Sequence, residues 1–179
     1  MMQTFKNTLL ISGSGRNVGK TSFILKVIEQ NISQKLAAIK ITPHFHEPTP
    51  GLIAIEVNEN FRVFQETNRD SEKDSSLFLR SGAEKVLYIQ TSDLFLNEAF
   101  LIALAQLEPD QPVVTESAAF RKFIVPGLYL FIQKLDLEVK PSAIEMKKLA
   151  DHIIISDGNS FSITPKSIRF DQTWQTTTL

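Results

Sequence analysis

The chain has 179 residues, 42% of them hydrophobic, which is enough to build a single domain (residues 1–179) around a substantial core. The formal net charge is −1 and both signs are mixed along the chain, so we expect neither a nucleic-acid partner nor an anionic membrane. The chain has no cysteine, no apolar run of about 18 residues and no signal-peptide core, so we expect a cytoplasmic protein whose metals would use oxygen or imidazole ligands.

The first predicted elements are a strand over residues 7–12, a glycine-rich turn and an amphipathic helix over residues 20–31. Gly19-Lys20-Thr21 closes the turn and matches a phosphate-binding loop (P-loop), in which backbone N–H groups cradle phosphates. We expect Lys20 to act as a catalytic residue on the β/γ oxygens and Thr21 to ligate Mg²⁺. The predicted nucleotide-binding residues of this segment are Gly13, Ser14, Gly15, Arg16, Asn17, Val18, Gly19, Lys20, Thr21 and Ser22.

Strand-like and helix-like segments alternate along the remaining chain, which predicts an α/β fold of the P-loop NTPase type, a mostly parallel sheet flanked by helices. The predicted strands cover residues 7–12, 36–41, 85–90, 112–116, 128–133 and 152–156, and the predicted helices cover residues 20–31, 74–82, 97–108 and 141–150. Residues 52–74 interrupt this alternation and are expected to form a β-hairpin excursion. The tail from Ser160 is expected to add an edge strand or a hairpin.

A proline-rich loop over residues 42–51 follows the second predicted strand, which ends near Lys40. Open α/β sheets bind ligands at the carboxyl ends of their strands, so Lys40 is a candidate nucleotide-binding residue. His44 and His46 are two positions apart and face the same side of an extended segment. We favour contact with substrate or phosphate over metal binding, because no third imidazole or thiolate lies nearby in the sequence.

Two later segments supply further candidate residues. Glu116 ends an apolar strand, a position from which a carboxylate can hold Mg²⁺ or its bound water, and we predict it as a metal ligand and catalytic residue. Asp74 and Arg80 lie on the predicted helix over residues 74–82. They are either site residues or, respectively, a helix N-cap and a surface cation.

Two segments compete as the site that would read the base. Residues 133–136 follow a strand and resemble the asparagine-lysine-x-aspartate motif of GTPases, with glutamine in the first place, so Asp136 is a candidate guanine-binding residue. Residues 156–159 also follow a strand, although a simple turn is the favoured interpretation of that segment.

Three segments that follow the P-loop resemble, in order, the MobB family of molybdopterin-guanine dinucleotide biosynthesis. Residues 38–46 resemble its lysine-threonine-histidine segment, residues 73–83 its lysine-aspartate-serine helix, and residues 113–117 its strand that ends in glutamate. Phe45 splits the histidines, and Ser117 stands where the family has glycine. The resemblance implies a protein that binds GTP or ATP with Mg²⁺ and hydrolyses it slowly, a homodimer, and a molybdenum-cofactor biosynthesis enzyme as partner.

A displaced glycine keeps a second interpretation open. Strict P-loop spacing puts the first glycine at position 14, where the chain has serine, and Gly13 instead lies six positions before Gly19. The loop of dethiobiotin synthetase is similar in that respect, which implies an ATP-dependent ligase or kinase that acts on a small molecule. A non-enzymatic, nucleotide-dependent binding module is a third possibility, because hydrolysis requires few residues that sequence can identify.

Overall fold

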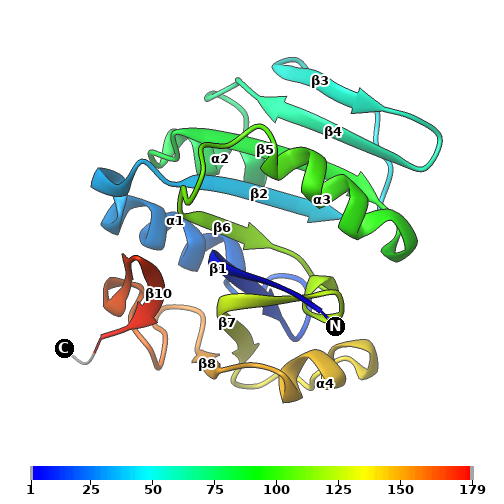
Figure 1. Ribbon diagram of the computed structural model, residues 1–179. Coiled ribbons are helices and arrows are strands. Elements are labelled where there is room, and N and C mark those ends of the chain that lie inside the picture. The colour runs from blue at the N-terminus through cyan, green and yellow to red at the C-terminus, as the bar shows by residue number, and fades with distance from the viewer. Residues whose placement is uncertain (1, 178–179) are drawn as a thin grey trace.

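An eight-stranded sheet organises residues 2–177, the part of the chain that the computed structural model describes (Figure 1). Residues 1, 178 and 179 belong to the predicted domain but lie outside the described residues. The strands, in chain order, are β1 (Gln3–Gly13), β2 (Ala37–Thr42), β3 (Leu52–Val57), β4 (Phe61–Glu66), β5 (Lys85–Thr91), β6 (Val113–Glu116), β7 (Ile124–Lys134) and β8 (His152–Ser156). The helices are α1 (Lys20–Gln30), α2 (Asp74–Arg80), α3 (Leu96–Leu104) and α4 (Pro141–Lys148).

The sheet is parallel over its larger part, as the alternating pattern predicts. Its strand order is β3-β4-β5-β2-β6-β1-β7-β8, and the six strands from β5 to β8 pair in parallel. The strand β1 therefore lies between β6 and β7 in the interior of the sheet. Since the carboxyl ends of β1, β2 and β6 meet at one edge, the residues that follow these strands are brought together.

Helices cover both faces of the sheet, and the side chains of β1 alternate between two cores. Leu9 and Ile11 pack with the apolar face of α1 and with α2, whereas Leu10 packs on the other face with α3 and α4. The buried residues of α1 are Phe23, Ile24, Val27 and Ile28, the four that the helical spacing predicts.

The predicted excursion is a β-hairpin that extends the sheet. Strands β3 and β4 pair antiparallel with each other, and β4 pairs antiparallel with β5, so β3 forms one edge of the sheet (Figure 1). Leu52 and Ile55 of β3 are half-buried and its other four residues are exposed, as expected for a strand with a neighbour on one side only.

The C-terminal region forms the other edge strand and a separate hairpin. Strand β8 closes the sheet beside β7, and β9 (Ile168–Asp171) pairs with β10 (Thr173–Thr176) outside it. Trp174 of this hairpin is buried, and its indole N–H donates to the carbonyl of Asn7 in β1 at 2.8 Å. The amide of Asn31, just after α1, donates to the carbonyl of Ile168 at 3.0 Å. These contacts fix the hairpin against β1 and the end of α1.

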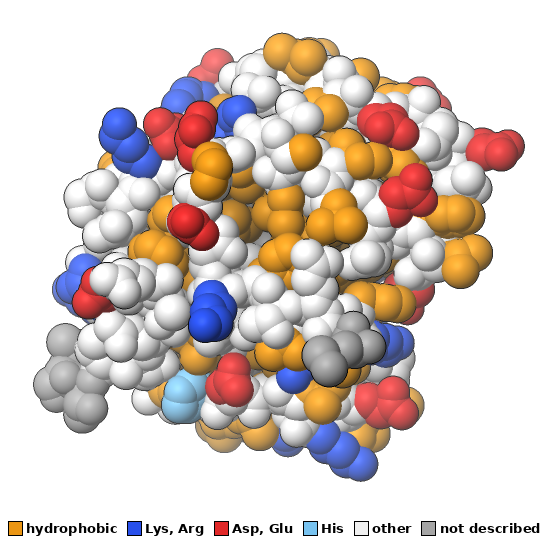
Figure 2. All heavy atoms as spheres, in the orientation of Figure 1, with side chains coloured by type: hydrophobic (Ala, Val, Ile, Leu, Met, Phe, Trp, Pro, Cys, Tyr) orange, Lys and Arg blue, Asp and Glu red, His pale blue; other side chains and the backbone are white. Residues whose placement is uncertain are grey.

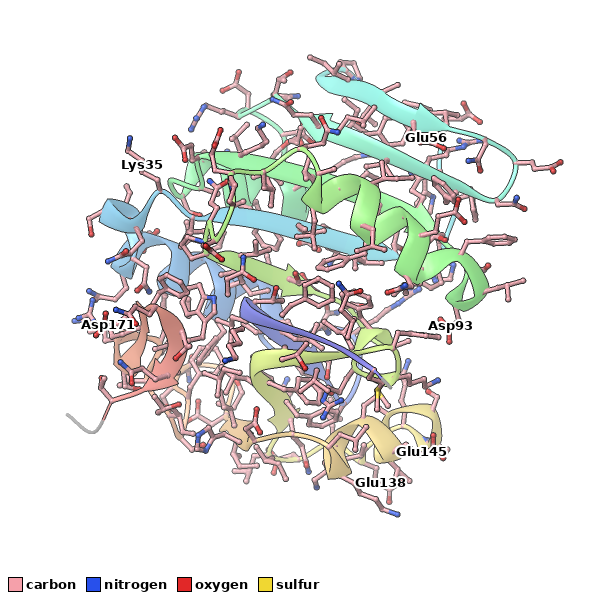
Figure 3. The ribbon with its side chains drawn as sticks, in the orientation of Figure 1. Lys35, Glu56, Asp93, Glu138, Glu145 and Asp171 are labelled. Atoms are coloured by element: carbon pink, nitrogen blue, oxygen red, sulfur yellow. The ribbon has the colours of Figure 1, made fainter. Side chains whose placement is uncertain are left out.

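The surface carries a mixture of charges. On the face in Figure 2, acidic and basic side chains lie interspersed around exposed apolar ones. Figure 3 places six charged residues at the periphery of the fold, and all six are exposed: Lys35, Glu56, Asp93, Glu138, Glu145 and Asp171. Within residues 2–177, no helix has both the length and the apolar character that a membrane span requires.

Candidate functional site

The first half of the glycine-rich turn is tied to the end of β7. The N–H of Ser14 donates to the carbonyl of Ile132 at 2.9 Å, and Ser14 is buried. A Cβ atom on Gly13 would lie 2.8 Å from that same carbonyl oxygen and 2.8 Å from Val18, closer than real Cβ contacts allow. The close approach therefore occurs at position 13, which explains why the glycine stands there and a serine is accommodated at position 14.

The second half of the turn leads into α1. Gly19 has φ of 99°, a left-handed conformation that favours glycine, and its carbonyl accepts from the N–H of Phe23 at 2.9 Å. The ring of Phe161 lies close above Gly19, where a Cβ atom would be 3.0 Å from the ring. Lys20 is the first residue of α1, and its ammonium donates to the carbonyl of Gly15 at 2.6 Å. The lysine thus bends back across the turn, as a P-loop lysine does.

A cavity of about 750 Å³ opens above this turn, at the carboxyl edge of the sheet. It is lined by residues 16–22, which are the second half of the turn and the start of α1. The cavity is large enough for a nucleotide, because small-molecule pockets span about 300–1,000 Å³. The other lining residues are Lys26, Lys40, Asp74, Glu116, Lys134, Ser156, Gly158, Asn159 and Phe161.

Lys40 joins two carboxylates at the base of the cavity. Lys40 of β2 is directly opposite Glu116 of β6 in the parallel register, and its ammonium lies 2.8 Å from Glu116 Oε2. The same ammonium donates to Asp74 Oδ2 at 2.6 Å. The Glu116 contact is an ion pair without hydrogen-bond alignment, so the buried Oε2 atom has no hydrogen-bond partner among the described residues.

Asp74 connects this pair to the P-loop. Its Oδ1 atom accepts a hydrogen bond from the Thr21 hydroxyl at 3.0 Å, while Oδ2 accepts from Lys40. Thr21 and Asp74 are 53 residues apart in the chain. The structure therefore gathers one hydroxyl and two carboxylates, from α1, α2 and β6, around one cavity.

These oxygens suit Mg²⁺. That ion prefers oxygen ligands and is usually held by one or two carboxylates together with waters and substrate phosphates. Thr21, Asp74 and Glu116 are the residues that would hold it, and Oε2 of Glu116, ion-paired with Lys40 but without a hydrogen bond among the described residues, keeps acceptor capacity. Within residues 2–177 no group of three or more His, Cys, Asp or Glu side chains could hold a metal. Phosphate oxygens would therefore have to complete the coordination.

Burial and neighbouring charges shift the two lysines in opposite directions. Burial is the largest effect on the pKa of Lys20 and lowers it; Glu116 and Asp74 raise that pKa and Lys40 and Lys140 lower it, and the net shift is downward. Burial also disfavours the charge on Lys40, but Glu116 and Asp74 together outweigh it and hold the pKa of Lys40 above 10.5. Lys20 donates to a neutral carbonyl and makes no ion pair among the described residues, whereas Lys40 is paired with the two carboxylates of Asp74 and Glu116.

Several predicted residues lie elsewhere. Asp136 is exposed and does not line the cavity. Arg80 is a surface residue that pairs with Glu72 at 3.3 Å, and His44 is also exposed and outside the cavity. Gly13, Ser14 and Gly15 shape the turn without lining the cavity.

Two lining residues escaped the sequence analysis, Lys26 and Phe161. Lys26 continues α1 beyond the recognised motif and lies 5.9 Å from the centre of the Phe161 ring. Phe161 follows the turn over residues 156–159, which the sequence analysis considered as a base-binding segment. No pattern in the nearby sequence indicates that the chain then folds back onto Gly19. Lys26 could have been predicted, because it lies four residues after Ser22 and therefore on the same face of the predicted helix.

No family model matches this sequence, and no curated protein matches it. Among solved structures, the fold is similar to LpxK from Aquifex aeolicus, whose crystal structure was determined in complex with ATP. The TM-score is 0.53 at 16% sequence identity, over 87% of this chain and 50% of LpxK, so the chain spans half the length of that protein. With the parallel sheet and the loop between β1 and α1, this similarity shows that the chain has the fold of the P-loop NTPases.

Proposed function

We propose that the protein binds a nucleoside triphosphate with Mg²⁺ in the cavity above the P-loop and cleaves the bond between its β- and γ-phosphates. The observation that carries this proposal is the meeting of Lys20 and Thr21 with Asp74 and Glu116 around one cavity. The structural similarity to LpxK, which was solved with ATP, supports a nucleotide as the ligand.

The chemistry requires positioning and charge neutralisation more than covalent catalysis. The N-terminus of α1 and the ammonium of Lys20 would neutralise the β/γ-phosphates. Thr21, Asp74 and Glu116 would hold Mg²⁺, which neutralises phosphate charge when it is bound. Glu116 would also orient the attacking water, and Lys40 keeps both carboxylates in place.

Thermal unfolding with and without nucleotide tests this proposal. ATP, GTP, CTP and UTP, each with Mg²⁺, are compared on the wild type, on Lys20→Ala and on Lys122→Ala, a surface lysine outside the cavity. A ligand at about a hundredfold its Kd stabilises the folded state by about 2.7 kcal/mol. We expect this shift in the wild type and in Lys122→Ala and its loss in Lys20→Ala. An unchanged midpoint with all four nucleotides would refute the proposal.

The same experiment decides how the base is read. Asn159 and Phe161 line the cavity, whereas the exposed Asp136 does not, so we expect Asn159→Ala to change the preference among nucleotides and Asp136→Ala to leave it unchanged. A preference for GTP that disappears in Asp136→Ala would instead support the GTPase-like motif.

The resemblance to MobB supports an accessory role in molybdenum-cofactor biosynthesis as a second candidate function. Each of its three segments contributes one residue to the same ion-paired group, namely Lys40, Asp74 and Glu116. Slow hydrolysis, a homodimer and a molybdenum-cofactor enzyme as partner are the predictions of this second candidate. Sedimentation of the purified protein with Mg²⁺ and nucleotide tests the homodimer directly.

A further inference from the structure

A second cavity adjoins the first on the side of β5. Its volume is about 340 Å³, and it shares Lys40 and Asp74 with the nucleotide cavity. The sheet register explains this position. Lys40 of β2 is opposite Tyr88 of β5 on one side and opposite Glu116 of β6 on the other, so the three residues form a row across neighbouring strands. The nucleotide cavity includes Glu116, whereas the second cavity includes Tyr88. Lys40 and Asp74 therefore form the boundary between the two.

The walls of the second cavity are held by specific contacts. The side chain of Gln90 is fully buried, accepts from the N–H of His46 at 3.2 Å and donates to the carbonyl of His46 at 3.1 Å. This pair of hydrogen bonds fixes the proline-rich loop after β2 above the cavity. Tyr88 stacks on Phe64, with ring centres 6.4 Å apart, and burial raises the pKa of its hydroxyl. The cavity is thus a preformed space with an aromatic wall.

Asp74 is placed to serve both cavities. One of its oxygens accepts from Thr21 on the nucleotide side and the other from Lys40, while its side chain keeps 35% of its surface exposed. A carboxylate offers about four lone-pair positions, so Asp74 can accept one more hydrogen bond from a hydroxyl in the second cavity. Such a hydroxyl would lie beside the position that the P-loop gives to the γ-phosphate.

We propose that the second cavity binds a small, uncharged, hydroxyl-bearing molecule that accepts the γ-phosphoryl group. This inference rests on the proposed nucleotide function. In the step, a bond forms between the acceptor oxygen and Pγ while the bond from Pγ to the β–γ bridging oxygen breaks, and the nucleoside diphosphate leaves. Asp74 orients the acceptor hydroxyl by accepting its hydrogen bond, and the hydroxyl proton is released to solvent. Lys20 neutralises the charge on the leaving diphosphate.

Charge identifies the class of acceptor. Three carboxylates, those of Glu47, Glu72 and Asp74, line the second cavity with two lysines, Lys40 and Lys73. Lys40 is already neutralised by its ion pairs with Asp74 and Glu116. Glu72 is likewise paired with the surface residue Arg80 at 3.3 Å, so the charges of Glu47 and Lys73 remain and cancel each other. The second cavity therefore offers no net positive charge to an anionic acceptor, which disfavours a carboxylate or carbamate substrate of the dethiobiotin synthetase type.

Transfer to chosen probes tests the inference. Mg²⁺ and the nucleotide that stabilises the protein most are incubated with glycerol, myo-inositol or methyl α-D-glucoside at roughly 50 mM, far above ordinary KM values. Glycerate and gluconate serve as matched anionic probes. Formation of the nucleoside diphosphate and release of phosphate are measured together. We expect the diphosphate to exceed the phosphate with a neutral probe, with the difference recovered as the phosphorylated probe.

Two tryptophan variants locate the acceptor site. Leu52→Trp fills the second cavity, whereas Leu94→Trp places the same ring on a side chain that is 82% exposed and outside both cavities. We expect transfer to fall about a hundredfold in Leu52→Trp, the scale of effect that misplacing a reactant by about 1 Å produces. Transfer in Leu94→Trp should match the wild type. A nucleotide-dependent rise in melting temperature shows that each variant is folded and loaded.

The outcomes separate this inference from the proposed function. Hydrolysis without transfer to any probe, transfer to the anionic probes alone, or equal transfer by Leu52→Trp and Leu94→Trp would each overturn the inference and leave nucleotide binding standing. Failure of every nucleotide to stabilise the wild type would remove the proposed function and the inference together.

Discussion

Replacement of Lys40 by methionine should destabilise the protein strongly, even without nucleotide. The side chain of Glu116 is 7% exposed and that of Lys40 18%, so the variant leaves a buried carboxylate without its cation. Removal of one partner of a buried ion pair costs about 3–5 kcal/mol. Asp74 is more exposed and keeps its bond from Thr21, so we expect the lower value, about 3 kcal/mol. For a chain of this size, that loss lowers the melting temperature by roughly 6–12 °C.

A double-mutant cycle separates this charge effect from a loss of packing. Glu116→Gln removes the buried charge and leaves Lys40 paired with Asp74, so we expect a cost of about 1 kcal/mol. The double variant should cost about 2 kcal/mol, less than the sum of the two single changes, because the uncompensated carboxylate is gone. Lys122→Met serves as the control, since its contact with Asp93 spans 3.6 Å between exposed groups and is worth less than about 1 kcal/mol.

Urea unfolding of the nucleotide-free protein measures these differences. The single tryptophan, Trp174, is 2% exposed and reports loss of the native packing by its fluorescence. The carboxylates raise the pKa of Lys40, so its stabilising contribution is complete below the ordinary value of 10.5 and is lost as the pH rises through the higher folded-state value. A cost for Lys40→Met below about 1 kcal/mol, or costs that simply add in the double variant, would refute the reasoning.

Three further changes have opposite or contrasting expected outcomes. Burial lowers the pKa of Lys20, so Lys20→Met should keep or raise the nucleotide-free melting temperature at neutral pH and abolish nucleotide stabilisation; a large loss of stability would contradict this. Gly13→Ala, whose Cβ would meet the Ile132 carbonyl, should cost about 1–3 kcal/mol in urea unfolding, whereas Gly15→Ala meets its nearest atom at 3.5 Å and should cost less. Hydrogen bonds from Ser160 and Asn159 lower the pKa of Asp157 to about 2, so its turn should persist below pH 3.8 and loosen as the pH falls toward 2; an NMR titration centred near 3.8 would argue against those bonds.

Local patterns predicted the elements around the P-loop well. The alternation of β1 between two cores and the apolar face of α1 are both properties of short stretches of sequence. Lys40 and Glu116 were also predicted at the ligand-binding edge, because each lies at or near the carboxyl end of a strand that the alternating pattern predicts to be parallel. The α/β class and the hairpin excursion were confirmed as well, because both follow from the order of strand-like and helix-like segments along the chain.

Strand order and the paths of loops could not be predicted. The bond between Thr21 and Asp74 depends on α2 packing beside α1, which no pattern within either helix specifies, so a helix cap was an equally good interpretation of Asp74. Asp136 follows β7 at the correct sheet edge, yet its turn directs it into solvent. Phe161 follows the adjacent strand β8, and its chain folds back over Gly19. Equivalent sequence positions thus lead to different places because long-range packing sets the direction of each loop.

The contact between Trp174 and Asn7 bears on how the chain folds during synthesis. β1 carries the P-loop at its carboxyl end and accepts the indole hydrogen bond at Asn7, in its first half, across 167 positions of sequence. While residue 174 is still within the ribosome, the first half of β1 and the adjoining side of α1 have no cover from the hairpin. Such long-range closure slows folding, since the entropy of ordering the intervening chain is lost before the contact forms. Removal of the hairpin should therefore expose apolar surface beside the P-loop strand and make a truncated chain prone to aggregate.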